Sequence, residues 1–217
     1  MAAQLDLKEI ERRAFRSTYE DGLWDIYYGL VVVGMAFFVF RPASGYSSMN
    51  LLRMLVILSL AYGLFWAGKK YITVPRMGQV RFGDIRRRKR AMMALVLGGV
   101  VLVQLSVLGL TALAWVNPEV SARVNDTLNS RDLMDLTVAL IGSLFVVVGM
   151  TLSAYFSDFP RGYLIAVLMA LAVFLMVFLN QPVYPILIGL LIIVPGVVLL
   201  ARFLKKYPQG SKAAGHE

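Results

Sequence analysis

Few residues in this chain could carry chemistry, and the closest pair of acids stands in the motif DGLWD. Asp21 and Asp25 are four residues apart, so on a helix they lie one turn apart on the same side. Two carboxylates in that arrangement could hold a metal ion for phosphoryl transfer, but the further acids that such a site needs are lacking. We interpret the pair as first-turn acids of a helix, where the helix dipole favours negative charge.

Other catalytic chemistry lacks its side chains. The chain has no cysteine, which excludes disulfides, thiolate metal sites and thiol nucleophiles. Its only histidine, His216, stands in the C-terminal tail, so no His-based metal site or Ser-His relay is expected in the core. We therefore expect no enzyme, no catalytic residue, no cofactor and no metal site.

One strongly polar side chain, Gln104, falls near the middle of an apolar run, LVLVQLSVLGL. An intramembrane polar residue can contact a substrate, but it more often forms a hydrogen bond with a neighbouring helix. Gln104 is accordingly a candidate intramembrane polar site, with helix packing as the favoured interpretation.

The elements that must position these residues are apolar helices. The chain of 217 residues is 59% hydrophobic and 16% charged, whereas an ordinary soluble domain is about 25% charged. A spanning helix needs roughly 20 mostly apolar residues. The sequence predicts an all-α, polytopic membrane bundle that forms one integral membrane domain over residues 1–207. Its six predicted spans cover residues 23–40, 51–68, 91–116, 133–156, 163–179 and 182–203.

The distribution of Lys and Arg predicts the orientation. With a cytoplasmic N-terminus, 18 of the 22 Lys and Arg residues fall on the cytoplasmic side and four on the other. Such a bias is typical of the positive-inside rule. We predict that both termini are cytoplasmic and that the protein is a multi-pass component of a bacterial-type inner (plasma) membrane.

Three segments outside the spans have predicted roles. Residues 5–20 place apolar residues on one side of a helix and basic residues on the opposite side, which predicts an amphipathic helix on the inner membrane surface. Residues 117–132 form the predicted external loop, and residues 208–217 form a predicted disordered tail. No nucleic acid is expected as a partner, because the basic residues adjoin membrane spans and form no separate fold.

The segment 69–90, KKYITVPRMGQVRFGDIRRRKR, holds nine Lys or Arg residues and forms the predicted cytoplasmic loop. Residues 71–74 and 79–82 resemble strands around a four-residue turn, so a small β-hairpin is predicted. The cations at its end favour anionic lipid headgroups, and the hairpin is the predicted docking surface for a protein partner. The candidate docking residues are Arg86, Arg87, Arg88, Lys89, Arg90, Tyr71 and Phe82.

Small residues recur at seven-residue spacing on three predicted spans. The pairs are Gly22 and Gly29, Gly142 and Gly149, and Gly189 and Gly196. A stripe of small residues lets helix backbones approach closely in a membrane. We interpret the six glycines as helix-packing positions, and a permeation path lined by backbone is the alternative.

Two functions remain open from the sequence. The near absence of charge within the spans and the glycine stripes favour a structural or accessory module, or a subunit of a membrane complex. The alternative is a small transporter or channel, because LVVVGM at 30–35 resembles FVVVGM at 145–150 in the manner of an inverted repeat. The sequence does not identify the substrate, the protein partner or the oligomeric state.

Overall fold

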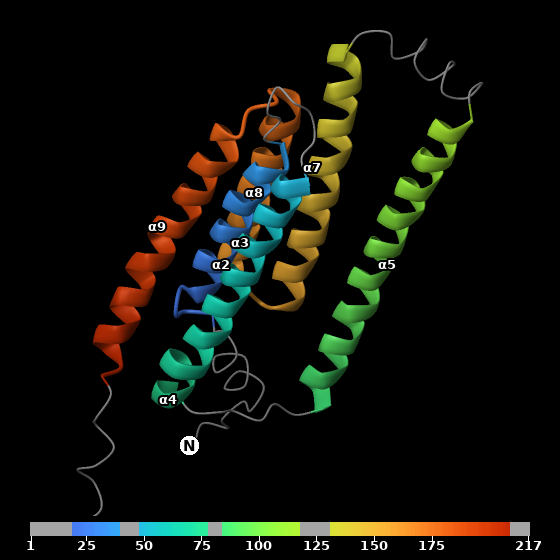
Figure 1. The fold of residues 1–217 in the computed structure, drawn as a ribbon. Coiled ribbons are helices and arrows are strands. Elements are labelled where there is room, and N and C mark those ends of the chain that lie inside the picture. The colour runs from blue at the N-terminus through green and yellow to red at the C-terminus, as the bar shows by residue number, and fades with distance from the viewer. Residues whose placement is uncertain (1–18, 40–47, 78–83, 118–130, 209–217) are drawn as a thin grey trace, which may run out of the picture. The chain divides into compact units, whose positions relative to one another are not determined.

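The computed structural model describes residues 19–39, 48–77, 84–117 and 131–208, and within them the chain is all-helical (Figure 1). This confirms the predicted all-α class. The helices of these residues are α2 (Leu23–Val39), α3 (Ser48–Ala67), the π-helix η1 (Gly68–Thr73), α4 (Val74–Met77), α5 (Asp84–Val116), α7 (Arg131–Phe156), α8 (Pro160–Phe178) and α9 (Val183–Lys206).

Each of the six predicted apolar runs coincides with a helix. Among the described residues, four helices are long and apolar enough to cross a membrane. The other two, α2 and α5, hold shorter apolar stretches. Large apolar side chains such as Leu95 and Leu102 are more than half exposed, and a soluble protein rarely shows so many of them. These features support a membrane-embedded protein. The four helices are Leu52–Arg76, Asp135–Phe156, Pro160–Phe178 and Val183–Lys206.

The chain divides into two compact units. The second unit, residues 84–185, contains α5, α7 and α8; α8 packs along α7, and α5 contacts α7. The turn between α7 and α8 is tight, because a Cβ on Gly162 would lie 2.7 Å from the Cβ of Ala154. Pro160 stands at the start of α8, where its missing N–H costs no helical hydrogen bond.

The first unit, residues 1–83 and 186–217, holds α2, α3, η1, α4 and most of α9. Here α2 packs on α3 and meets α9 through glycines. A Cβ on Gly29 would lie 2.8 Å from the carbonyl oxygen of Gly189, and a Cβ on Gly189 would lie 2.8 Å from that of Gly29. One heptad away on each helix, a Cβ on Gly22 would overlap the carbonyl oxygen of Gly196. The two helices are therefore antiparallel and in backbone contact at both glycine pairs.

The remaining glycine pair has a different environment. A Cβ on Gly142 would lie 3.6 Å from Cγ1 of Val173 on α8, which is ordinary van der Waals contact. A Cβ on Gly149 would meet no atom within 4 Å. The structure thus brings four of the six predicted packing glycines into backbone contact, leaves Gly142 in loose contact, and leaves Gly149 facing open space.

The predicted hairpin is wrong in its first strand. Residues 71–74 are helical, because η1 and α4 continue α3 without a break to Met77. We call this continuous helix, Ser48–Met77, the α3 rod. The second predicted strand, residues 79–82, lies outside the described residues. So do residues 5–18 of the predicted surface helix, residues 118–130 of the external loop, and residues 209–217 of the tail.

Candidate functional site at the Asp21–Lys69–Thr73 cluster

The chain enters α2 through a turn centred on Gly22, whose φ of +73° lies in the left-handed region. Glycine adopts that conformation without strain. The turn places the carboxylate of Asp21 over the start of α2, where Oδ1 accepts a hydrogen bond of 3.2 Å from the backbone N–H of Leu23. Asp21 is completely buried, so its charge requires partners within the protein.

Those partners come from the end of the α3 rod. The ammonium of Lys69 and the hydroxyl of Thr73 each donate a hydrogen bond of 2.6 Å to Oδ2 of Asp21. The Lys69 side chain is 19% exposed. Hydrogen bonds to an ionised acceptor are short and strong, so this cluster, the Asp21–Lys69–Thr73 cluster, joins the start of α2 to the end of α3.

The π-helix η1 supplies both donors. Lys69 and Thr73 are four residues apart and lie on the same side of the rod. The wide turn closes with the N–H of Val74 donating to the carbonyl of Lys69, and Gly68 is buried within it. A Cβ on Gly68 would lie 2.9 Å from the Leu23 side chain, so glycine permits this close approach. Single π-turns inside helices are rare and often occur at functional sites.

A second contact at the same end of the unit joins the rod to α9. Arg76 donates one hydrogen bond of 3.0 Å from Nε to the carbonyl of Tyr207 and another of 3.0 Å from Nη1 to the carbonyl of Ile72. Tyr207 follows directly after α9, where backbone carbonyls lack helical partners and a basic side chain can satisfy them. The start of α2, the end of the α3 rod and the end of α9 therefore meet at one end of the unit.

Aromatic side chains surround this end of α2. The ring of Trp24 lies 4.5 Å from that of Phe65 and stacks at 5.6 Å on that of Tyr28. The ammonium of Lys70 lies 4.7 Å from the centre of the Trp66 ring and 5.4 Å from that of Tyr71. Consecutive lysines thus have opposite roles: Lys69 turns inward to Asp21, and Lys70 lies over aromatic rings at the surface.

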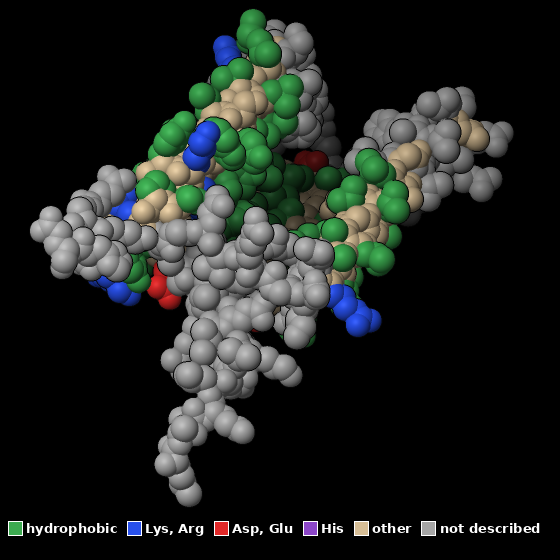
Figure 2. Space-filling view, turned by 90° about the horizontal axis from the view of Figure 1, so that it is seen from below, with side chains coloured by type: hydrophobic (Ala, Val, Ile, Leu, Met, Phe, Trp, Pro, Cys, Tyr) green, Lys and Arg blue, Asp and Glu red, His purple; other side chains and the backbone are tan. Residues whose placement is uncertain are grey.

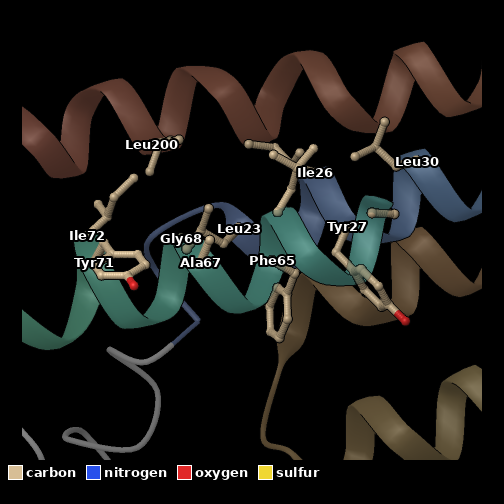
Figure 3. A pocket seen from close by; sticks show the side chains of 12 residues that line it. Leu23, Ile26, Tyr27, Leu30, Phe65, Ala67, Gly68, Tyr71, Ile72 and Leu200 are labelled. Atoms are coloured by element: carbon tan, nitrogen blue, oxygen red, sulfur yellow. The ribbon is translucent and has the colours of Figure 1, made fainter. Parts of the chain in front are cut away.

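An apolar groove of about 400 Å³ runs beside the cluster (Figure 3). It lies within the first unit, between the first turns of α2, the last turns of α3 with η1, and Leu200 of α9. Tyr27 and Phe65 line one part of it and Tyr71 lines the end next to Lys70. The groove has the size of a small-molecule site, but its lining offers little except hydrocarbon and aromatic rings.

The cluster is suited to holding helices together rather than to catalysis. Asp21 accepts three hydrogen bonds and has no exposed surface, so no substrate reaches it. Asp25, one turn further along α2, is also buried. Across the described residues no three His, Cys, Asp or Glu side chains gather as metal ligands would.

The predicted docking residues are only partly described. Tyr71 is exposed, and it lies on the helical rod rather than on a hairpin. Arg88 is exposed near the start of α5, and Gln104 is half-buried further along α5. Hydrophobic side chains cover most of the described surface in Figure 2, with Lys and Arg at separate points. The side chains of Arg86, Arg87, Lys89, Arg90 and Phe82 lie outside what the structure describes.

The sequence interpretation missed Lys69 and Thr73 as partners of Asp21. It treated Lys69 as one cation of a basic loop and Asp21 as a helix-dipole acid. A signal was present, because Lys69-x-x-x-Thr73 places a donor pair one turn apart at the end of span two. The predicted topology also puts that end on the same membrane face as Asp21. Asp21 stands at the start of a span and has no polar partner close to it in the sequence. An acid that is buried there needs hydrogen-bond donors from another helix, and Lys69 and Thr73 are such donors.

Comparison of the chain with protein-family models, with curated proteins and with solved structures gives no significant match.

Proposed function

We propose that the chain is a non-enzymatic multi-pass membrane protein that acts as a structural or accessory module, or as a subunit, of a membrane complex. The supporting observation is the Asp21–Lys69–Thr73 cluster, in which a completely buried carboxylate joins two helix ends. The glycine contact between α2 and α9 supports the same conclusion, because interlocked backbones suit a rigid scaffold.

We further propose six spans with both termini in the cytoplasm of an inner (plasma) membrane. The contacts around Asp21 and Arg76 support the first part. They hold the start of α2, the end of the α3 rod and the end of α9 together, as expected if all three lie at one membrane face. Three further helices, α5, α7 and α8, connect the rod to α9. If each of them crosses the membrane, α9 starts on the opposite face, and its own crossing, the fourth, brings its end back to the face where the rod ended.

Reporter fusions test this topology. A fusion at position 80 should behave as cytoplasmic and one at position 125 as external, because the cations that set the orientation flank position 80. Alkaline phosphatase and green fluorescent protein fusions read the two sides with opposite signals. A cytoplasmic signal at both positions would contradict the crossing by α5, and the reversed pair would contradict the proposed orientation.

The subunit proposal has its own measurement. Membranes containing the protein, solubilised in a mild detergent, should show it in an assembly of higher mass than the single chain in its detergent micelle. Native electrophoresis followed by identification of the co-migrating proteins gives the result. If the protein migrates only as a single chain, it belongs to no stable complex, and the proposed subunit role is contradicted.

The transporter alternative receives no support from the aligned repeat. Matching 30–35 with 145–150 pairs Gly34 with Gly149. A Cβ on Gly34 would lie 3.3 Å from the Ile57 side chain, whereas one on Gly149 would meet open space. The two positions therefore differ in their packing, and the accessory-module function is the one we propose.

A further inference from the structure

The groove of the first unit is formed almost entirely by apolar side chains. Its walls are aliphatic and aromatic, and the hydroxyls of Tyr27 and Tyr71 are the principal polar groups among the lining side chains. Leu64 and Tyr71 are each more than 60% exposed, so the groove is open along its side. A ligand that fills it must therefore present hydrocarbon along most of its length.

The lining excludes a polypeptide more readily than a lipid. A peptide backbone laid in this groove would leave its N–H and C=O groups without partners, which is costly in an apolar environment. A neighbouring helix satisfies its own backbone but needs small residues on the facing surface for close approach. Small residues line part of the groove, at Ala61, Ala67 and Gly68, but bulky side chains such as Leu64, Phe65 and Leu200 stand among them and keep a second helix backbone at a distance. An acyl chain meets neither difficulty.

The charge at one end of the groove specifies the headgroup. Tyr71 lines that end, and the ammonium of Lys70 lies 5.4 Å from the centre of its ring. Lys69 is neutralised by Asp21, whereas Lys70 is exposed. Arg76 and the exposed Lys205 and Lys206 of α9 stand at the same end of the unit. This end is therefore complementary to a negative charge.

We infer that the groove binds one acyl chain of an anionic phospholipid from the cytoplasmic leaflet, with the lipid phosphate at Lys70. The inference rests on the proposed membrane insertion and orientation. It names a site distinct from the basic residues 86–90, and it assigns different work to two adjacent lysines: Lys69 holds the fold and Lys70 selects the lipid.

Tryptophan fluorescence tests the site in the full chain. A Trp115→Phe background leaves Trp24 and Trp66, which both belong to the first unit, and the Trp24 ring contacts the groove residue Phe65. The protein is reconstituted into vesicles of phosphatidylglycerol and phosphatidylcholine, with brominated acyl chains on one lipid at a time, because bromine quenches tryptophan on contact. At equal mole fractions, brominated phosphatidylglycerol should quench more strongly, and the ratio gives its relative binding constant.

Three variants separate the site from general surface attraction. Lys70→Gln should lower the relative binding constant for phosphatidylglycerol about fivefold, the effect of one well-placed cation. Ala67→Phe grows into the groove and should abolish the preference by excluding the chain. Arg53→Gln removes an equal charge from an exposed residue of the same unit, near the start of α3 and away from the groove, so it should leave the preference within about twofold.

Several outcomes would overturn the inference: equal quenching by the two brominated lipids in the parent protein, an unchanged preference in Lys70→Gln, or an equal loss in Arg53→Gln. Should Ala67→Phe fail to fold, as judged by gel filtration and helical circular dichroism, the comparison of Lys70→Gln with Arg53→Gln still decides. Failure of the membrane topology is seen separately by the fusions at positions 80 and 125, whose signals do not depend on Lys70.

Discussion

Replacing Asp21 by alanine should lower the free energy of unfolding by about 3–5 kcal/mol, the cost of leaving a buried ion-pair partner alone. The ammonium of Lys69 is mostly buried and bonds to Asp21, and Thr73 loses its acceptor as well. The first turn of α2 also loses the carboxylate that accepts a hydrogen bond from the backbone N–H of Leu23. Thermal or denaturant unfolding in detergent measures the effect.

A matched control and a rescue sharpen this test. Asp135 is an exposed acid near the start of α7, so Asp135→Ala should change stability by no more than about 0.5 kcal/mol. Combining Asp21→Leu with Lys69→Met removes both charges and should recover much of the loss, because an apolar replacement of a buried pair is often neutral. Equal melting temperatures for Asp21→Ala and Asp135→Ala would show that the cluster does not hold the helices.

The positions of the helices could be predicted because apolar runs of membrane length have few alternatives. The predicted run 23–40 is α2 to within one residue, and 133–156 begins two residues after α7 does. The prediction failed at residues 71–77, where polar residues follow the apolar run of the second span. β-Branched residues and Pro75 suggested a strand and a turn, but the rod continues there as helix. A local π-turn is one way in which a helix accommodates a nearby proline, and this one carries both donors to Asp21.

The site was less predictable than the helices, because sequence spacing gives the face of a helix but not what lies opposite. Gly29 and Gly149 both stand in seven-residue glycine pairs. Only Gly29 meets another backbone, that of Gly189. Lys69 shows the same limit for charge: the sequence gives a cation at a boundary, and only the fold shows that Asp21 lies 2.6 Å away.

The glycine contacts carry the second large effect. Gly189→Leu should destabilise the protein by about 3 kcal/mol or more, at the upper end of overpacking costs. Its Cβ would lie 2.8 Å from the carbonyl oxygen of Gly29 and 3.2 Å from the backbone nitrogen of Val33. Backbone atoms of α2 cannot rotate away as a side chain does, so α2 and α9 must separate.

Gly149→Leu is the matched control, because it makes the same substitution in a glycine pair of the same spacing. A Cβ there meets open space, and replacing a mid-helix glycine by leucine favours the helix by roughly 0.8–1 kcal/mol. Its melting temperature in detergent should equal or exceed that of the parent, while Gly189→Leu melts far lower. If the two variants lose the same stability, the spacing of the glycines rather than the contact of α2 with α9 determines the effect, and the antiparallel glycine contact is not what holds the first unit together.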